Sequence, residues 1–261
     1  MIDVVLIGAG NVATHLAIGL HKRGIHIRQI FSRTTTSAQL LAEQVGATFT
    51  SSKSAIYTDA SLYICSVKDS EISTVLTNID FHNKLLIHTA GSVALDILAP
   101  FSANYGVLYP LQTFSKSKPI NWEQCNLFIE ANNEKNAEFI LQIASLLSTK
   151  VQIIDSEKRK NLHIAAVFAC NFTNHLYTLA SELMLGSGAN FNDLLPLIEE
   201  TTNKLCTLSP YEAQTGPAVR QDTNIVAEHI AQLAKTDINK ATIYALLSRN
   251  IMQTHKMKNK E

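Results

Sequence analysis

The residues with the clearest chemical role form a glycine-rich turn near the start of the chain. Residues 8–13, GAGNVA, follow the apolar run VVLI and precede a stretch with helical periodicity, THLAIGLHKRG. In this GxGxxA pattern the first glycine permits a tight turn, the second lets backbone N–H groups approach a pyrophosphate, and the alanine allows close helix packing. The alternative is a tight turn that has lost its ligand. The residues that we expect to bind a dinucleotide here are Gly8, Gly10, Asn11 and Val12.

The end of the second apolar run, IRQIF, distinguishes between the two nicotinamide cofactors. NAD-binding proteins usually place a carboxylate about 20 residues after the glycine turn, whereas NADP-binding proteins place an arginine nearby. Here the run ends in Ser32, Arg33 and Thr34, without an acidic residue. A guanidinium and two hydroxyls suit a 2′-phosphate. The sequence therefore predicts NADP as the cofactor, and the alternative is that Arg33 is a solvated loop cation.

Two further loops follow apolar runs, VKDSEI after SLYICS and TAGS after LLIH. In open α/β sheets, ligands lie at the carboxyl ends of the strands. We therefore expect the segment from Ser66 through Val67 to Lys68, and the turn formed by His88, Thr89, Gly91 and Ser92, to border the ribose and nicotinamide. A third tip, YPLQTF from Tyr109, is either part of the same site or a rigid packed connection.

These loops need a sheet to position them, and the first half of the chain alternates apolar runs with helical stretches. This pattern predicts an α/β, Rossmann-type, doubly wound and mostly parallel sheet with helices on both faces. The strands that we expect are Val4 to Ile7, His26 to Phe31, Thr48 to Phe49, Leu62 to Ser66, Leu85 to His88, Gly106 to Pro110, Asn126 to Glu130 and Val151 to Ile154.

From about Ser156 onward the sequence has only helical periodicity. The expected helices are Glu157 to Leu185, Asn192 to Thr207, Thr223 to Ala234 and Ile238 to His255, with N-caps at Asn190 or Asn192, Asp222 and Asp237. The sequence thus predicts a dinucleotide-binding domain over residues 1–155 and an all-α domain over residues 156–261. The domains should share a packed interface and a cleft.

Composition narrows the classes of protein further. Lys plus Arg and Asp plus Glu each number 22, so the formal net charge is zero and no global field attracts nucleic acid or a membrane surface. The first residues lack the basic region and long apolar run of a signal peptide, and the expectation is a cytoplasmic protein. The four cysteines are widely spaced, which favours buried, reduced thiols without a metal site.

The segments IGAGNVATHL, FSRT, ICSVKDSEI and HTAGS resemble the NADP-binding domain of pyrroline-5-carboxylate reductase, the coenzyme F420-dependent NADP oxidoreductases and the 6-phosphogluconate dehydrogenase-like superfamily. The segments HTAGSVALDIL, YPLQTF, HIAAVFACNFTNHL and TGPAVRQDTNIVAEHI are similar to Rossmann-like proteins with the helical domain DUF2520. This resemblance implies a Rossmann domain followed by a helical domain that builds a homodimer and closes the cleft over the active site. It implies no particular substrate.

In the resembled dehydrogenases, the first helix of the second domain carries a catalytic lysine and asparagines that hold the substrate. His163 stands at the lysine position here, and Asn171 matches an asparagine. At 100° per residue, His163, Asn171 and Asn174 share one broad helix face. The resemblance therefore suggests His163 as a proton donor, although a histidine in place of lysine departs from the pattern and a purely structural histidine is the alternative.

The segment around Arg220 also admits two interpretations. Arg220 either recognises a substrate carboxylate or phosphate, or it pairs locally while Asp222 caps the next helix. The leading functional hypothesis is an NADP-dependent oxidoreductase that passes a hydride between NADP(H) and a C=O or C=N group of a small metabolite. The alternatives are a non-catalytic NADP(H) sensor or scaffold and, by analogy alone, a protein whose second substrate is F420.

Overall fold

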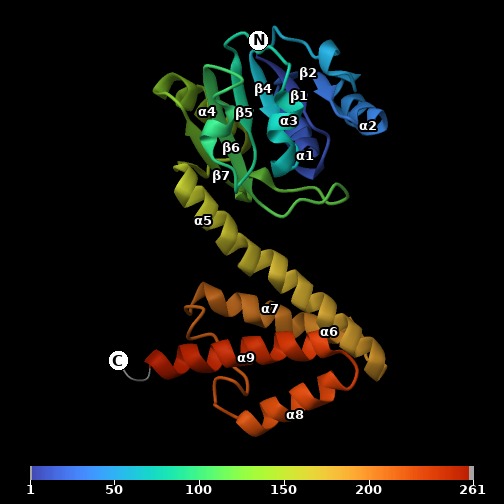
Figure 1. The fold of residues 1–261 in the computed structure, drawn as a ribbon, viewed down its shortest axis with the longest axis vertical. Helices are drawn as coiled ribbons and strands as arrows, with labels where there is room; N and C mark the ends of the chain where they lie inside the picture. The colour runs from blue at the N-terminus through green and yellow to red at the C-terminus, as the bar shows by residue number, and fades with distance from the viewer. Residues whose placement is uncertain (1, 259–261) are drawn as a thin grey trace. The chain divides into compact units, whose positions relative to one another are not determined.

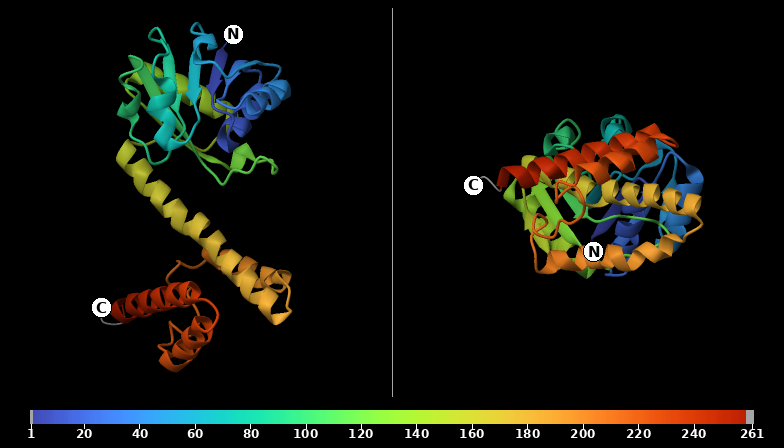
Figure 2. Two further views of the ribbon diagram at one scale, coloured as in Figure 1. Left: turned by 45° about the vertical axis from the view of Figure 1, so that its right-hand side comes forward. Right: turned by 90° about the horizontal axis from the view of Figure 1, so that it is seen from below.

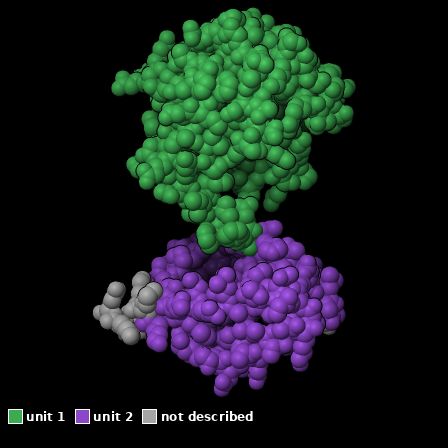
Figure 3. All heavy atoms as spheres, viewed as in Figure 1, with its two compact units in different colours: residues 1–172 green, residues 173–261 purple. Residues whose placement is uncertain are grey.

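A computed structural model describes residues 2–258 of the chain. The chain divides into two compact units, one ending at Phe172 and the other beginning at Thr173 (Figure 3). The domain boundary predicted between residues 155 and 156 coincides with the end of the sheet. Helix α5 (Ser156–Ala166) and the helical segment after it nevertheless belong to unit 1 by their contacts.

Unit 1 is built on an eight-stranded sheet in the order β3-β2-β1-β4-β5-β6-β7-β8 (Figure 1). Strands β1 to β6 are mutually parallel, whereas β7 is antiparallel to β6 and parallel to β8. The predicted mostly parallel α/β sheet is therefore confirmed. The strands are β1 (Asp3–Ile7), β2 (His26–Phe31), β3 (Thr48–Thr50), β4 (Leu62–Cys65), β5 (Leu85–His88), β6 (Asn104–Leu111), β7 (Asn126–Ala131) and β8 (Val151–Ile153).

Strands β4 and β5 are buried along their whole length, and β1 is buried from Val4 to Ile7, because both faces of the sheet are covered. Val4 and Leu6 of β1 pack with helices α1 (Asn11–His21), α2 (Thr35–Val45) and α4 (Glu134–Leu147) on one face. Val5 and Ile7 pack on the opposite face with α3 (Ile72–Leu76) and a 3₁₀ turn at Leu95–Leu98. Because strands β1 to β6 are parallel, their carboxyl ends lie at one edge of the sheet, where the predicted loops lie.

A long helical stretch follows β8. Asp155 caps α5, accepting a hydrogen bond at 2.8 Å from the backbone N–H of Lys158. The segment Val167–Phe172 is π-helical and leads into α6 (Thr173–Ser187). The helix predicted from Glu157 to Leu185 is therefore present, but with a wider turn inside it.

Unit 2 contains α6, α7 (Leu195–Asn203), α8 (Thr223–Ala234) and α9 (Ile238–Lys258). Helices α8 and α9 lie side by side (Figures 1 and 2). The Asp237 carboxylate accepts hydrogen bonds from the backbone N–H groups of Asn239 and Lys240 at the start of α9. Few hydrophobic side chains are buried among the described residues of this unit: Ala218, Val226 and Ala241.

Candidate functional site

The glycine turn joins the ends of three strands. Gly8 has a φ of +122°, and a Cβ atom here would lie 2.1 Å from the carbonyl oxygen of Ser66, just after β4. The Gly8 N–H donates to the carbonyl oxygen of Phe31, at the end of β2, at 2.7 Å. Any other residue would be strained and would clash. Gly8 therefore fixes the geometry of the sheet edge.

Gly10 occupies a different kind of position. It precedes α1 with a φ of −78°, and a Cβ atom here would meet nothing within 4 Å. Packing does not require a glycine, so the missing side chain leaves the backbone open to a ligand. The first N–H groups of α1 have no acceptor within the helix, and its first turn holds no acidic residue. This end of α1 therefore attracts an anion such as a pyrophosphate.

The turn opens into a pocket of about 1230 Å³ at the carboxyl ends of the parallel strands. Ordinary small-molecule pockets measure roughly 300–1,000 Å³, so this one has room for a dinucleotide and a small second molecule. Every lining residue belongs to unit 1. The predicted site residues among them are Gly8, Gly10, Asn11, Val12, Ser32, Arg33, Thr34, Ser66, Val67, Lys68, Thr89, His163 and Asn171.

Arg33 lines this pocket and is paired with Glu71, which does not line it. Its Nη1 donates to Oε2 of Glu71 at 2.6 Å, and 65% of its side chain is exposed. The guanidinium is therefore not an isolated loop cation, because it links the end of β2 to the loop after β4. A phosphate that binds Arg33 has to compete with the Glu71 carboxylate or share the guanidinium with it.

Hydroxyl groups connect the loops that follow β4 and β5. The Thr89 hydroxyl donates to Oγ of Ser66 at 3.0 Å, and both residues line the pocket. The Ser92 hydroxyl lies outside the pocket lining and makes a short hydrogen bond to the carboxylate of Asp69, which does line it. Ser92 therefore acts on the pocket wall through Asp69.

His163 lies in the pocket beside a residue that the sequence analysis left undecided. The phenol oxygen of Tyr109, in β6, is 3.0 Å from Nδ1 of His163. A Cβ atom on Gly91 would lie 2.7 Å from that nitrogen and 2.8 Å from Cζ of Tyr109. The pair therefore packs directly on the backbone of Gly91. Burial, as the largest cause, raises the pKa of Tyr109, which keeps the phenol protonated at neutral pH.

A buried arginine holds the helix that carries His163. Arg159 lies one turn before it in α5 and is fully buried. Its guanidinium makes a short ion pair with Glu130 of β7 and donates to the carbonyl oxygen of Val93 at 2.5 Å. Glu130 also accepts hydrogen bonds from the backbone N–H and hydroxyl of Ser156 at the start of α5. This network fixes α5 against the sheet and thereby positions His163.

The π-helical segment changes the spacing of the predicted catalytic residues. Asn171 lies within it and lines the pocket together with Cys170. Asn174 lies beyond it, in unit 2. The 100° spacing used to place both asparagines on the His163 face holds for a regular α-helix, and a π-helical turn departs from it. The role of Asn174 stays a prediction.

His88, the last residue of β5, was expected to border the cofactor, but it is fully buried and does not line the pocket. Its Nδ1 accepts from the backbone N–H of Ala90 at 3.1 Å, while its Nε2 has no partner among the described residues. Burial, aided by the positive charge of Arg159, lowers the pKa of His88 to about 3. The ring is therefore neutral and structural.

The segment from Gln112 to Gln124, here called the strap, covers α1. The side chain of Asn11 donates to the carbonyl oxygen of Phe114 at 2.9 Å, and Nε2 of His15 lies 2.8 Å from the carbonyl oxygen of Ser115. Gln112, Thr113 and Phe114 line the nucleotide pocket. Together with Tyr109 they belong to the tip YPLQTF, for which the sequence left two interpretations open, and here they line the pocket. The only local signal was their place after the sixth expected strand.

Other expectations concern groups outside this pocket. Arg220 is exposed and has no hydrogen bond or ion pair with any described residue, and the Asp222 side chain makes no capping hydrogen bond to α8. All four cysteines are free. The predicted burial is confirmed for Cys65 and Cys125, and it is wrong for Cys170 and Cys206, which are exposed in this chain.

The described part of the chain lacks two further kinds of feature. None of its helices combines the length and the apolar character that crossing a membrane requires. Over the same residues, no group of three or more His, Cys, Asp or Glu side chains is placed to hold a metal ion.

Two families match this sequence, one in each half. Residues 3–92 match the family described as NADP oxidoreductase coenzyme F420-dependent, and residues 125–251 match the family described as Domain of unknown function (DUF2520). Both resemblances found in the sequence are therefore confirmed.

Solved structures share the fold over nearly the whole chain. A "putative NADP oxidoreductase" from Bacteroides fragilis is 44% identical, with a TM-score of 0.90 over 97% of this chain and 98% of that one. An imine reductase from Myxococcus stipitatus in complex with NADP⁺ is 14% identical, with a TM-score of 0.65 over 99% and 94% of the two chains. A pyrroline carboxylate reductase from Plasmodium falciparum with NADP bound is 13% identical, with a TM-score of 0.60 over 97% and 100%. The last two similarities establish the fold alone.

Among curated proteins, the chain is 26% identical over 210 residues to a glutamyl-tRNA reductase of Legionella pneumophila (strain Paris). The match covers 74% of this chain and 46% of that protein. The chain thus spans about half the length of the curated relatives it matches.

Proposed function

This chain belongs to one family with the Bacteroides fragilis protein, and its own residues 125–251 match the DUF2520 family; from that premise we propose that it is an NADP-dependent oxidoreductase. It transfers a hydride between NADP(H) and a C=O or C=N group of a small metabolite. One observation carries the proposal: the Gly10 turn and the Tyr109–His163 pair lie in one pocket. An anion site and a proton-holding pair are the two parts that such a reductase needs from its own residues.

The residues of the pocket fit the proposed nucleotide. Gly10 and the start of α1 would hold the pyrophosphate, since a Cβ atom on Gly10 would enter open space and no carboxylate opposes an anion in the first turn. Ser32, Arg33 and Thr34 would hold the 2′-phosphate. When bound, NADPH supplies the hydride from C4 of its nicotinamide ring.

The proposed role of the Tyr109–His163 pair is to hold and deliver one proton. If the Tyr109 phenol donates to Nδ1, the His163 ring carries its own proton on Nε2. As the neighbouring carbon accepts the hydride, the ring gives this proton to the oxygen or nitrogen of the substrate, and Nδ1 takes the phenol proton of Tyr109. The ring thus stays neutral, and the pair as a whole gives up one proton, which it regains from water before the next turnover. Gly91 and Arg159 keep the ring in this position. Asn171 and Asn174 are proposed to hold the substrate.

Parallel titrations with NADPH and NADH test the nucleotide assignment. Binding of NADPH to the wild-type protein in the micromolar range is expected, with NADH weaker. Arg33→Ala should weaken NADPH binding about tenfold or more and leave NADH nearly unchanged. Glu71→Gln is the reciprocal variant: it frees the guanidinium and should tighten NADPH binding selectively. Equal effects of Arg33→Ala on both nucleotides would refute the 2′-phosphate site.

Turnover is tested by following nicotinamide absorbance with small imines and keto acids. His163→Gln should slow NADPH oxidation about 10²-fold or more while nucleotide affinity stays constant. Tyr109→Phe, which removes only the phenol oxygen, should have a smaller effect in the same direction. Tight NADPH binding without oxidation by any C=O or C=N compound would support the non-catalytic sensor instead.

We also propose that unit 2 forms a homodimer. Several of its large hydrophobic side chains are exposed in the single chain, including Leu185 at 77%, Ile238 at 66%, and Leu197 and Leu246 at 64% each. A contiguous apolar surface marks an interaction site, and we propose that these side chains contribute to one. Light scattering during size-exclusion chromatography should give twice the mass of the 28.7 kDa chain, and a monomer at micromolar concentration would refute the dimer.

A further inference from the structure

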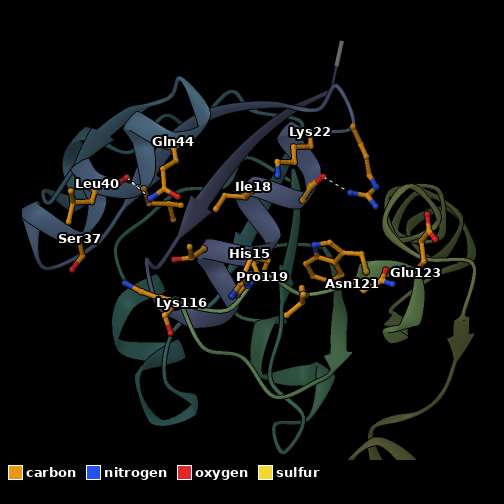
Figure 4. Close-up of a pocket in the computed structure, with 17 residues that line it drawn as sticks. His15, Ile18, Lys22, Ser37, Leu40, Gln44, Lys116, Pro119, Asn121 and Glu123 are labelled. Atoms are coloured by element: carbon orange, nitrogen blue, oxygen red, sulfur yellow. Dashed lines mark hydrogen bonds between the residues drawn. The ribbon is translucent and has the colours of Figure 1, made fainter.

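Unit 1 contains a second cavity, of about 570 Å³, between α1, α2 and the strap (Figure 4). Figure 4 shows His15 and Ile18 of α1, and Lys22 just after its end, between the α2 residues Ser37, Leu40 and Gln44 on one side and Asn121 and Glu123 of the strap on the other. Ser37 lines both this cavity and the nucleotide pocket. The proposed NADP site leaves this cavity without a role.

Apolar side chains line one wall of the cavity, and the ring among them, Trp122, is 7% exposed. The Trp122 ring packs against α1, where a Cβ atom on Gly19 would lie 2.5 Å from Nε1 and 3.0 Å from Cε2 of the indole. A glycine is therefore needed in α1 for the tryptophan to lie on the helix backbone. Ile18, Leu41 and Ile120 extend the apolar lining. Such a surface suits an organic molecule better than an inorganic ion.

The charged groups around this surface are predominantly positive. Lys22, Arg23 and Lys116 line the cavity, against a single carboxylate, Glu123. The amino groups of both lysines have no hydrogen bond or ion pair with any residue that the structure describes. The Arg23 guanidinium donates to the carbonyl oxygens of Gly19 and Leu147, at 3.2 and 3.3 Å, and not to an acid. The positive charge is therefore available to an anionic ligand.

The strap places this cavity next to the nucleotide pocket. Its first residues, from Gln112 to Phe114, line the nucleotide pocket, and residues from Lys116 onward line the second cavity. Asn11 and His15 attach it to α1 between the two. A ligand in the second cavity would therefore rest on the same segment that borders the nucleotide.

We propose that this cavity is a second ligand site, which binds a small organic anion with an apolar body. The apolar body lies against Trp122, and the positive charge of Lys116 and Lys22 selects the anion. Size, an apolar wall and convergent polar groups are the usual features of a small-molecule site. The inference does not depend on NADP binding, because its residues, apart from Ser37, are different ones.

Trp122 is the single tryptophan of the chain and therefore a built-in reporter. We would titrate the full-length protein with 4-phenylbutyrate and follow the one indole N–H signal in a ¹H–¹⁵N spectrum. A saturable shift is expected. The uncharged 4-phenylbutyramide has the same apolar body and should bind about tenfold more weakly, because it lacks the charge.

Two lysine variants provide the matched comparison. Lys116→Met keeps the apolar stem and should weaken 4-phenylbutyrate binding severalfold, about the value of one partly exposed charge interaction. Lys118→Met, two residues along the strap and outside the cavity lining, should change nothing. An unchanged spectrum before titration establishes that each variant is folded.

Three results would each overturn the second site. They are equal affinity for the acid and the amide, equal effects of the two lysine variants, and competitive displacement of the probe by NADPH. A failure of NADPH to bind at all would refute the proposed cofactor and leave this measurement valid, so the two proposals fail separately.

Discussion

The substitution Gly10→Ala tests whether the glycine at this position is needed for packing or for binding a ligand. The new methyl group would have no atom within 4 Å, and the φ of −78° suits alanine. Alanine is a poorer N-cap than glycine by about 0.5–1.5 kcal/mol, but it lowers the entropy of the unfolded chain, which stabilises the protein by about 0.4–1 kcal/mol. The free energy of unfolding should therefore change by less than about 1 kcal/mol.

Nucleotide binding should respond much more strongly to the same change. The methyl group occupies the space through which a pyrophosphate would approach the first N–H groups of α1. Losing one charge-assisted hydrogen bond to a phosphate costs about 1.5–3 kcal/mol, which corresponds to roughly a 10- to 150-fold increase in the dissociation constant for NADPH. NADH carries the same pyrophosphate, so its affinity should fall by a similar factor.

The assay is a fluorescence titration of wild type and variant with both nucleotides, alongside a thermal unfolding curve. Gly186→Ala, in α6 of unit 2, is the control, because a Cβ atom there also meets nothing within 4 Å. It should not alter nucleotide affinity. If Gly10→Ala binds NADPH as tightly as wild type, the pyrophosphate does not lie on this turn.

Three further predictions concern the supports of the site. Arg159→Met leaves the largely buried Glu130 carboxylate without its cation and should lower the free energy of unfolding by about 3 kcal/mol or more in urea titrations. Adding Glu130→Gln should recover part of this loss. A loss below about 1 kcal/mol would contradict the role of this pair. The pKa of His88 is lowered from 6.5 to about 3, so between these pH values only the unfolded chain binds a proton at this residue, and the free energy of unfolding falls as the pH falls. His88→Asn should reduce this dependence of the free energy of unfolding on pH. An unchanged dependence would assign it to other groups. Saturating NADPH should slow alkylation of Cys170 about tenfold but not that of Cys206, and equal protection would place the nucleotide elsewhere.

The sequence was most informative where a local pattern has a single structural solution. Leu85 to His88 is a strand with the predicted ends, because a run buried on both faces fits only the interior of a covered sheet. His26 to Phe31 also has the predicted ends, with its first residue exposed and its last three buried. The GxGxxA turn is an equally local signal, because only a glycine tolerates the backbone conformation at position 8. These signals determined the fold class and the edge of the sheet at which a ligand would bind.

Contacts between distant segments could not be found in this way. Tyr109 and His163 are 54 residues apart, and their hydrogen bond depends on how α5 leaves the sheet. Arg159 lies in a polar helical stretch with no sign of burial, yet it is among the largest fully buried side chains. The π-helical turn before Asn171 likewise alters a spacing that the sequence analysis took as regular.

The sequence by itself therefore determined a Rossmann-type sheet, its glycine turn and the segments from which a site could be built. Only the tertiary structure decided which side chains meet at that site, which of them are buried, and that the strap encloses a second cavity on α1. The physical reason is that strands, turns and helices follow from interactions over a few residues. The position of one side chain relative to another depends on the packing of whole elements, and small changes in register or helix geometry can redirect it.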